Sequence, residues 1–304
     1  MTSSAPPLPD VVSSAARAAL DALARTAPAD ISLAGMRAAA DAVQEQMARA
    51  QLRKYQVTIT DDVIDGVPAR IFTPSEPVRG GADRLLINFH GGGFQVDSGS
   101  LSENIPICAL TGVSVTSGLY RMAPEYRFPS AVDDALCVYR AALTRYDPKR
   151  IAVYGTSAGG ILTAQLMARV KSLGMPMPAA AGYFSISADF VNDGDSERFF
   201  PLATGRTIAS GMAGYLGEDR ADPLVSPIFD DLAAYPPALL VAGTRDTLLS
   251  HTARFHLAHI RAGVDARLVI FEAMPHAHWA YVDAPESDEA FQVMANFFTA
   301  ALAR

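Results

Sequence analysis

One short stretch limits the fold of this chain more than any other, the run from Ile151 to Gly160 (IAVYGTSAGG). A short apolar segment typical of a buried strand meets Gly-x-Ser-x-Gly at residues 155–159, and an apolar helix-forming segment follows. Glycine tolerates close backbone approach, so the sequence predicts a sharp strand-to-helix turn with Ser157 at the helix N-terminus. Unpaired N–H groups there favour developing negative charge, as a nucleophilic serine requires. A glycine-rich turn with no catalytic role would have the same sequence pattern. Other residues must therefore decide whether Ser157 is a nucleophile.

Length, charge and cysteine content exclude several classes of protein. The 304 residues, half of them apolar, are enough for one large domain or two modest ones. A net charge of −7 without a basic run argues against nucleic acid or an anionic membrane as the main partner. No signal peptide or membrane-spanning run is expected, and two cysteines without a zinc pattern indicate reduced thiols. These features predict a soluble cytoplasmic protein, and scarce lysine with abundant alanine favours a bacterial source.

Apolar periodicity predicts two N-terminal helices, over residues 10–25 and 32–50, and a hairpin over residues 55–72. Strands and helices then alternate: strands near 85–89, 113–119, 150–155, 180–186, 238–242 and 267–271, and helices near 100–110, 130–145, 157–173, 250–262 and 286–302. Such alternation is typical of a mostly parallel sheet with helices on both faces, and function gathers at the carboxyl ends of its strands. Residues 189–222 lack a clear strand and are expected, with the N-terminal helices, to form a lid.

Three further stretches carry the residue types that acyl transfer needs. The run His90-Gly91-Gly92-Gly93-Phe94 follows an expected strand, and its N–H groups can approach an oxyanion with no Cβ in the way. A nucleophilic serine needs a base, and the base needs an acid, in the chain order Ser, Asp, His for this class of sheet. Asp246 and His276 each follow an expected strand in that order. Three other carboxylates compete for the acid's role but follow no comparably clear strand: Asp189, Asp222 and Asp230.

The loop after the last expected strand carries two histidines, so the base has two candidates. His276 directly follows Met274-Pro275, and proline restricts the direction in which the chain leaves the strand. His278, beside Trp279, is expected to line the pocket or the outer face of the loop. Two histidines so spaced could also bind a metal, but no further ligand stands at a suitable spacing. Three histidines of one expected helix are interpreted as partly exposed, without a chemical role: His251, His256 and His259.

Several motifs, in one order along the chain, resemble those of a known family. They are His90-Gly-Gly-Gly-Phe94, Tyr120-Arg-Met-Ala-Pro-Glu125, Gly155-Thr-Ser-Ala-Gly159, Asp222-Pro-Leu-Val-Ser-Pro227, Gly243-Thr-Arg-Asp246, Gly263-Val-Asp-Ala266 and Met274-Pro-His276. Together they resemble the hormone-sensitive-lipase-like esterases, bacterial family IV of the α/β-hydrolase fold, in the branch with Gly-Thr-Ser-Ala-Gly. The chain departs from the family at Leu119, where a loop-bracing aspartate is usual, and at His278, where an aromatic residue is usual.

The resemblance implies an α/β-hydrolase fold, with a mostly parallel central sheet, helices on both faces and a helical cap. It implies that Ser157 is the nucleophile, Asp246 the acid and His276 the base. The implied oxyanion hole consists of the N–H groups of Gly92, Gly93 and Ala158. The expected divisions are N-terminal cap helices at 1–54, the core at 55–188 and 223–304, and a cap insertion at 189–222.

The expected function is that of a serine carboxylesterase acting on short- to medium-chain acyl esters through an acyl-enzyme, with no cofactor and no metal. The expected partner is a small-molecule ester, with neither nucleic acid nor membrane insertion. A homodimer is also expected, because the family often dimerises at the sheet edge and the C-terminal helix is rich in apolar bulk. A lactone or amide hydrolase would use the same residues. A non-catalytic ligand-binding protein of this fold is the alternative outside the enzymes.

Overall fold

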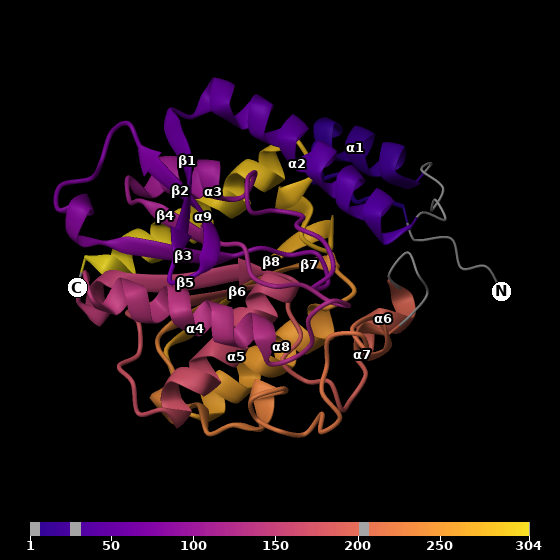
Figure 1. The fold of residues 1–304 in the computed structure, drawn as a ribbon. Coiled ribbons are helices and arrows are strands. Elements are labelled where there is room, and N and C mark those ends of the chain that lie inside the picture. The colour runs from indigo at the N-terminus through magenta and orange to yellow at the C-terminus, as the bar shows by residue number, and fades with distance from the viewer. Residues whose placement is uncertain (1–6, 25–31, 201–206, 304) are drawn as a thin grey trace.

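The computed structural model describes residues 7–24, 32–200 and 207–303, and these form an eight-stranded sheet of order β1-β2-β4-β3-β5-β6-β7-β8 (Figure 1). The strands are β1 (Val57–Ile64), β2 (Val67–Pro74), β3 (Leu85–Phe89), β4 (Val115–Gly118), β5 (Ile151–Thr156), β6 (Ala180–Phe184), β7 (Ala238–Arg245) and β8 (Ala266–Pro275). β2 pairs antiparallel with β1 and β4, and the remaining pairs are parallel. The predicted hairpin and the predicted, mostly parallel sheet are confirmed.

Helices cover both faces of this sheet (Figure 1). Their bounds are α1 (Ser14–Ala24), α2 (Leu33–Lys54), α3 (Asn104–Thr111), α4 (Ser130–Leu143), α5 (Ala158–Ser172), α6 (Ser196–Phe199), α7 (Ile208–Gly211), α8 (Leu249–Arg261) and α9 (Pro285–Leu302). α4, α5 and α8 pack on one face, and α3 and α9 pack on the other. Among the described residues, no helix is both long and apolar enough to cross a membrane.

The central strands are apolar on both sides because both sides are covered. In β3 every residue is buried, and successive side chains enter opposite cores. Ile87 and Phe89 pack with the residues of α4 and α5, whereas Leu86 packs with those of α3 and α9. Burial on both faces explains why β3 and β5 appear in the sequence as uninterrupted apolar runs, while the hairpin strand β1 stays partly exposed.

Helix α2 lies above the sheet and is attached to the loops that leave it (Figure 1). The guanidinium of Arg37 donates to both carboxylate oxygens of Glu125, at 2.7 and 2.8 Å, and to the carbonyl of Gln95 at 2.8 Å. Farther along α2, the buried side chain of Gln44 donates to the carbonyl of Asp97 and accepts from the N–H of Leu101. These bonds hold α2 over the loop that follows β3.

The sequence-based reason for a dimer fails at α9. Its apolar side chains were expected to exceed what one buried face needs, but the large ones are buried within the protein. These residues are Phe291, Met294, Phe297, Phe298 and Leu302. They fill the space between α9, α3 and the sheet, so this helix presents no excess apolar surface. The homodimer stays a prediction, and light scattering at micromolar concentration tests it.

Candidate active site

The turn between β5 and α5 holds Ser157 in a conformation that few residues adopt. Its φ is 55° and its ψ is −121°, and its N–H donates to the carbonyl of Phe184 at 2.8 Å. The flanking glycines make the turn possible. A Cβ on Gly159 would lie 1.7 Å from the carbonyl oxygen of Phe89, and one on Gly155 would lie 2.3 Å from Gly159. The turn therefore requires glycine at both positions, and it raises Ser157 above the sheet edge.

One row of hydrogen bonds joins three side chains from the carboxyl ends of different strands. Nε2 of His276 lies 2.9 Å from Oγ of Ser157, and Nδ1 of His276 lies 2.8 Å from Oδ1 of Asp246. Asp246 is fully buried, whereas the His276 side chain is 25 % exposed. In this row, Nδ1–H donates to the carboxylate, and Nε2 can accept the serine proton.

The carboxylate of Asp246 is held by more than the histidine. The hydroxyl of Ser185 donates to Oδ2 at 2.5 Å, and the N–H of Leu248 donates to Oδ1 at 2.8 Å. Burial by itself raises the pKa of Asp246, but the charge and hydrogen bonds of His276 and the bonds from Ser185 and Leu248 outweigh it, so the pKa is lowered. The group is therefore an anion that can orient an imidazole and stabilise an imidazolium.

Two backbone segments lie beside Ser157: the first residue of α5 and the glycines that follow β3. Ala158 is the first residue of α5, where a helix leaves its N–H without an intrahelical acceptor. Gly92 has φ of 114°, and a Cβ there would lie 2.0 Å from the carbonyl oxygen of Val96. Gly92 and Gly93 line the same cavity as Ser157 and His276. Gly92, Gly93 and Ala158 therefore stay the candidates for binding an oxyanion beside the serine.

A cavity of about 550 Å³ opens above the row of hydrogen bonds and is lined mainly by apolar side chains. Helix α2 contributes Ala39, Ala40 and Val43, and the segment at α7 contributes Ile208 and Met212. Large apolar side chains of residues 189–222 differ from one another in their positions. Met212 lines the cavity, Phe199 is 70 % exposed, and Tyr215 packs in the core against Phe94 with ring centroids 3.6 Å apart.

The loop of residues 90–94, called here the glycine loop, is held in place although residue 119 is a leucine and not the usual aspartate. The carboxylate of Asp97, whose side chain is 13 % exposed, accepts from the N–H groups of Gly99 at 3.2 Å and Ser100 at 2.9 Å, and it lies 3.7 Å from Nδ1 of His90. The hydroxyl of Tyr120 donates to the carbonyl of His90 at 2.8 Å, and the two rings stack. Asp97 therefore supplies, from just beyond the loop, the negative charge that the family resemblance led us to expect at residue 119.

The expected position of His278 is wrong. Its side chain is fully buried, beneath the loop rather than in the cavity or on the outer face. It lies against the rings of Phe271 and Trp279, with centroid distances of 5.2 and 5.0 Å, and burial lowers its pKa to about 4. His251 and His259, interpreted from the sequence as partly exposed, are buried as well. Both lie on the face of α8 that packs against the rest of the protein, where His259 contacts the ring of Tyr183 in β6 and His251 contacts Ser187.

Glu103 is a cavity residue that the sequence patterns missed. Its side chain is buried beside Thr156, the neighbour of the nucleophile candidate, and it also lies next to Trp279. Burial raises its pKa to about 8, against the lowering effect of hydrogen bonds from Thr156 and Trp279. The raised pKa favours the protonated form of this carboxyl group at neutral pH.

This carboxyl group predicts a pH dependence of stability. Between pH 4.5 and about 8 the folded protein keeps a proton that the unfolded chain releases, so stability falls as the pH rises through this window. Glu103→Gln removes this loss. The free energy of unfolding of the variant, relative to that of wild type, is expected to be roughly 1–4 kcal/mol higher at pH 9 than at pH 5. One pKa unit corresponds to about 1.4 kcal/mol. Urea unfolding at both pH values measures the gain, and a difference that is constant with pH would contradict it.

Comparisons with known proteins show which proteins this chain is similar to. Residues 86–280 match the family described as alpha/beta hydrolase fold. An acetyl-hydrolase of Streptomyces hygroscopicus is 30 % identical over 227 residues, covering 72 % of this chain and 76 % of that protein. The carboxylic ester hydrolase LipN of Mycobacterium tuberculosis is 32 % identical over 272 residues, covering 81 % and 70 %.

Among solved structures, the crystal structure of an esterase from the bacterial hormone-sensitive lipase family is similar, with a TM-score of 0.81 and 27 % identity. The match covers 96 % of this chain and 99 % of that one. With the family match over residues 86–280, the chain belongs to the α/β-hydrolase fold family and, within it, to the hormone-sensitive-lipase-like (bacterial family IV) esterases.

Proposed function

We propose that this protein is a serine carboxylesterase that hydrolyses short- to medium-chain acyl esters. The observation that carries the proposal is the row of hydrogen bonds from Ser157 through His276 to Asp246, at 2.9 and 2.8 Å, on the floor of an apolar cavity. The names of the relatives, acetyl-hydrolase and carboxylic ester hydrolase, support the same reaction.

In the proposed reaction, Oγ of Ser157 attacks the ester carbonyl while Nε2 of His276 takes the serine proton. Asp246 holds the imidazole in the required tautomer and stabilises the imidazolium. The N–H groups of Gly92, Gly93 and Ala158 bind the oxyanion of the tetrahedral intermediate. His276 then protonates the leaving alcohol as the C–O bond breaks. Water adds to the acyl-enzyme by the same steps, which releases the carboxylic acid and restores the serine.

The walls of the cavity support acyl esters of modest size. Alanines of α2 and the side chains of Ile208 and Met212 offer apolar contacts to a short alkyl chain. In this proposal the cap comprises residues 1–54 and 189–222, over a core of 55–188 and 223–304. A cytoplasmic location also belongs to the proposal, supported by Cys108 and Cys137, which are free thiols in the structure.

A series of p-nitrophenyl esters from acetate to decanoate tests the proposal, with a lactone and an anilide assayed in parallel. We expect turnover of the esters, with the highest kcat/KM at short to medium chain length. A protein that binds these esters without turnover would be the non-catalytic alternative. Preferential hydrolysis of the lactone would replace the substrate class but keep the residues in their roles.

A further inference from the structure

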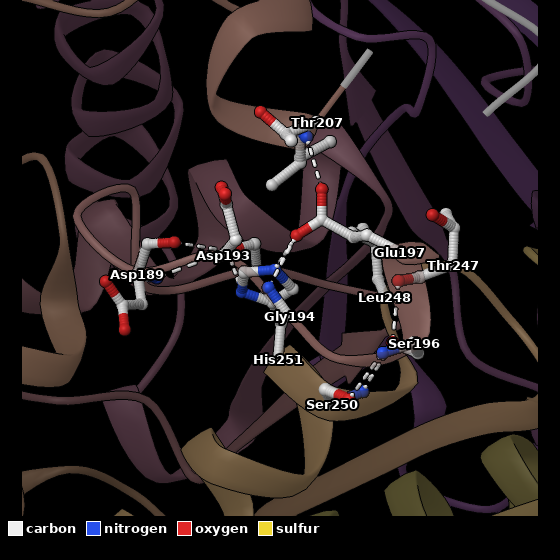
Figure 2. A network of polar contacts seen from close by, with 12 residues as sticks. Asp189, Asp193, Gly194, Ser196, Glu197, Thr207, Thr247, Leu248, Ser250 and His251 are labelled. Atoms are coloured by element: carbon white, nitrogen blue, oxygen red, sulfur yellow. Dashed lines mark hydrogen bonds and ion pairs between the residues drawn. The ribbon is translucent and has the colours of Figure 1, made fainter. Parts of the chain in front are cut away.

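A second buried polar network lies beside the cavity, around the carboxylate of Glu197 in α6 (Figure 2). Oε1 accepts from the N–H of Gly194 at 2.7 Å and lies 2.6 Å from Nε2 of His251. Oε2 accepts from the N–H of Ile208 at 2.6 Å. The side chain is 5 % exposed. Burial raises the pKa of Glu197, but His251 and the two N–H groups outweigh it, and the pKa is lowered.

His251 connects this carboxylate to the core of the protein. Its ring is fully buried in α8, and Nδ1 lies 2.9 Å from Oγ of Ser187 and 3.0 Å from a guanidinium nitrogen of Arg254. A guanidinium can only donate, so Nδ1 acts as the acceptor and Nε2–H donates to Glu197. The glutamate is therefore bonded on one side to a rigid core helix, which begins three residues after Asp246.

The other oxygen of Glu197 holds a wall of the cavity. Ile208 is the first residue of α7, and Ile208 and Met212 both line the cavity above Ser157. Glu197 thus joins α6, α7 and α8 through one charged group. Helix α2 also lines the cavity, and its Arg37 pairs with Glu125 outside the helix; these two side chains are considerably more exposed, at 31 % and 48 %. A buried carboxylate with three donors fixes its neighbours more firmly than an exposed ion pair does.

We propose that Glu197 is a specificity-determining positioning residue, which fixes Ile208 against α8 and thereby sets the size of the group that the cavity accepts. The inference rests on the proposed esterase function. Without the carboxylate, the N–H of Ile208 and the ring of His251 lose a shared acceptor, and α7 is free to move outward. The cavity then widens at Ile208 and Met212, short acyl chains lose contacts, and longer chains gain room.

The test compares chain-length profiles of p-nitrophenyl esters for wild type and Glu197→Ala. For the variant we expect KM for the acetate and butyrate esters to rise about tenfold while kcat stays within about threefold. The ratio of kcat/KM for octanoate to that for acetate is expected to rise about fivefold or more. Ile208→Ala, which widens the same wall directly, should shift the ratio in the same direction.

Ser196→Ala is the matched control. Ser196 lies next to Glu197 in α6, and its buried hydroxyl donates to the carbonyl of Thr247 at 2.8 Å and accepts from the N–H of Ser250 at 3.0 Å. It therefore ties α6 to the start of α8 without being the acceptor of the Ile208 N–H. The control should keep the wild-type ratio, so a change in both variants would indicate general loosening of α6 and overturn the assignment.

Glu197→Gln keeps the comparison decisive if the alanine variant does not fold. The amide retains one acceptor oxygen but turns an N–H₂ group toward a donor. The octanoate-to-acetate ratio of kcat/KM for this variant should therefore lie between the ratios of wild type and Glu197→Ala. A folded Glu197 variant with the wild-type ratio overturns the inference. A wild-type protein that hydrolyses none of the esters would instead overturn the proposed function, so the two failures are distinguishable.

Discussion

Replacing Ser157 by alanine is expected to lower kcat on p-nitrophenyl butyrate by about 10⁴-fold or more while the protein stays folded. In the proposed reaction this hydroxyl attacks the ester, and no other oxygen lies at the end of the row from Asp246 through His276 in the described structure. The residual rate is expected to come from the proposed oxyanion pocket and from substrate binding alone. Alanine fits the turn without new contacts because it keeps the Cβ and removes one atom. Steady-state kinetics with a matched thermal unfolding curve measures both effects.

Ser172→Ala supplies the control for this prediction. Ser172 ends the same helix, α5, and its exposed hydroxyl donates to the carbonyl of Arg169 at 2.8 Å, far from the cavity. Its activity should equal that of wild type within experimental error. If Ser157→Ala keeps most of the wild-type kcat, the nucleophile is another group and the proposed chemistry is wrong.

The sheet was predictable because its central strands stand out in the sequence as apolar runs. β3 and β5 are uninterrupted apolar runs, and burial on both faces explains why. Each run also ends at a distinctive group, the glycines after His90 and the turn at Ser157. Side chains at the carboxyl ends of neighbouring parallel strands meet at one edge, so chain order together with strand positions was enough to bring Ser157, Asp246 and His276 together.

The supporting residues were not predictable in the same way. Ser185, which donates to Asp246, and Asp97, which braces the glycine loop, act through single hydrogen bonds made across loops. Such contacts depend on loop conformation, and a period of 2 or 3.6 residues carries no information about it. Glu103 is different, because an acidic residue among the mainly apolar residues of an expected helix is detectable in the sequence, and a carboxyl group is seldom fully buried without a reason.

The histidines show where helical spacing misleads. His251 and His259 lie in an amphipathic helix with many polar residues, and this favoured an exposed interpretation. Both sit on the inner face of α8, where His251 bonds to Glu197 and His259 packs against Phe255. The partner of His251 comes from α6, 54 residues away, and no local pattern specifies it. Long-range polar pairing of this kind becomes visible only in the folded chain.

Replacing His276 by alanine is expected to lower kcat by about 10³-fold or more while the protein folds normally, the second of the two largest effects. Both ring nitrogens of His276 lie within hydrogen-bond distance of their proposed partners, and its side chain is 25 % exposed, so removal costs little packing. The space left by the ring opens to the cavity. Added imidazole is therefore expected to restore part of the activity of this variant, because it can take the position between Ser157 and Asp246.

His278→Ala separates the two loop histidines by a different readout. This ring is fully buried against Phe271 and Trp279, so its removal leaves a hole and should lower the free energy of unfolding by about 2–4 kcal/mol. Per folded molecule, kcat should stay within about tenfold of wild type, because the ring lies beneath the loop and outside the cavity. His276→Ala is thus expected to lower kcat, and His278→Ala is expected to lower the free energy of unfolding. If His278→Ala were the inactive enzyme and His276→Ala stayed active, the base would be His278, and the row from Ser157 to Asp246 would not be the path of the proton.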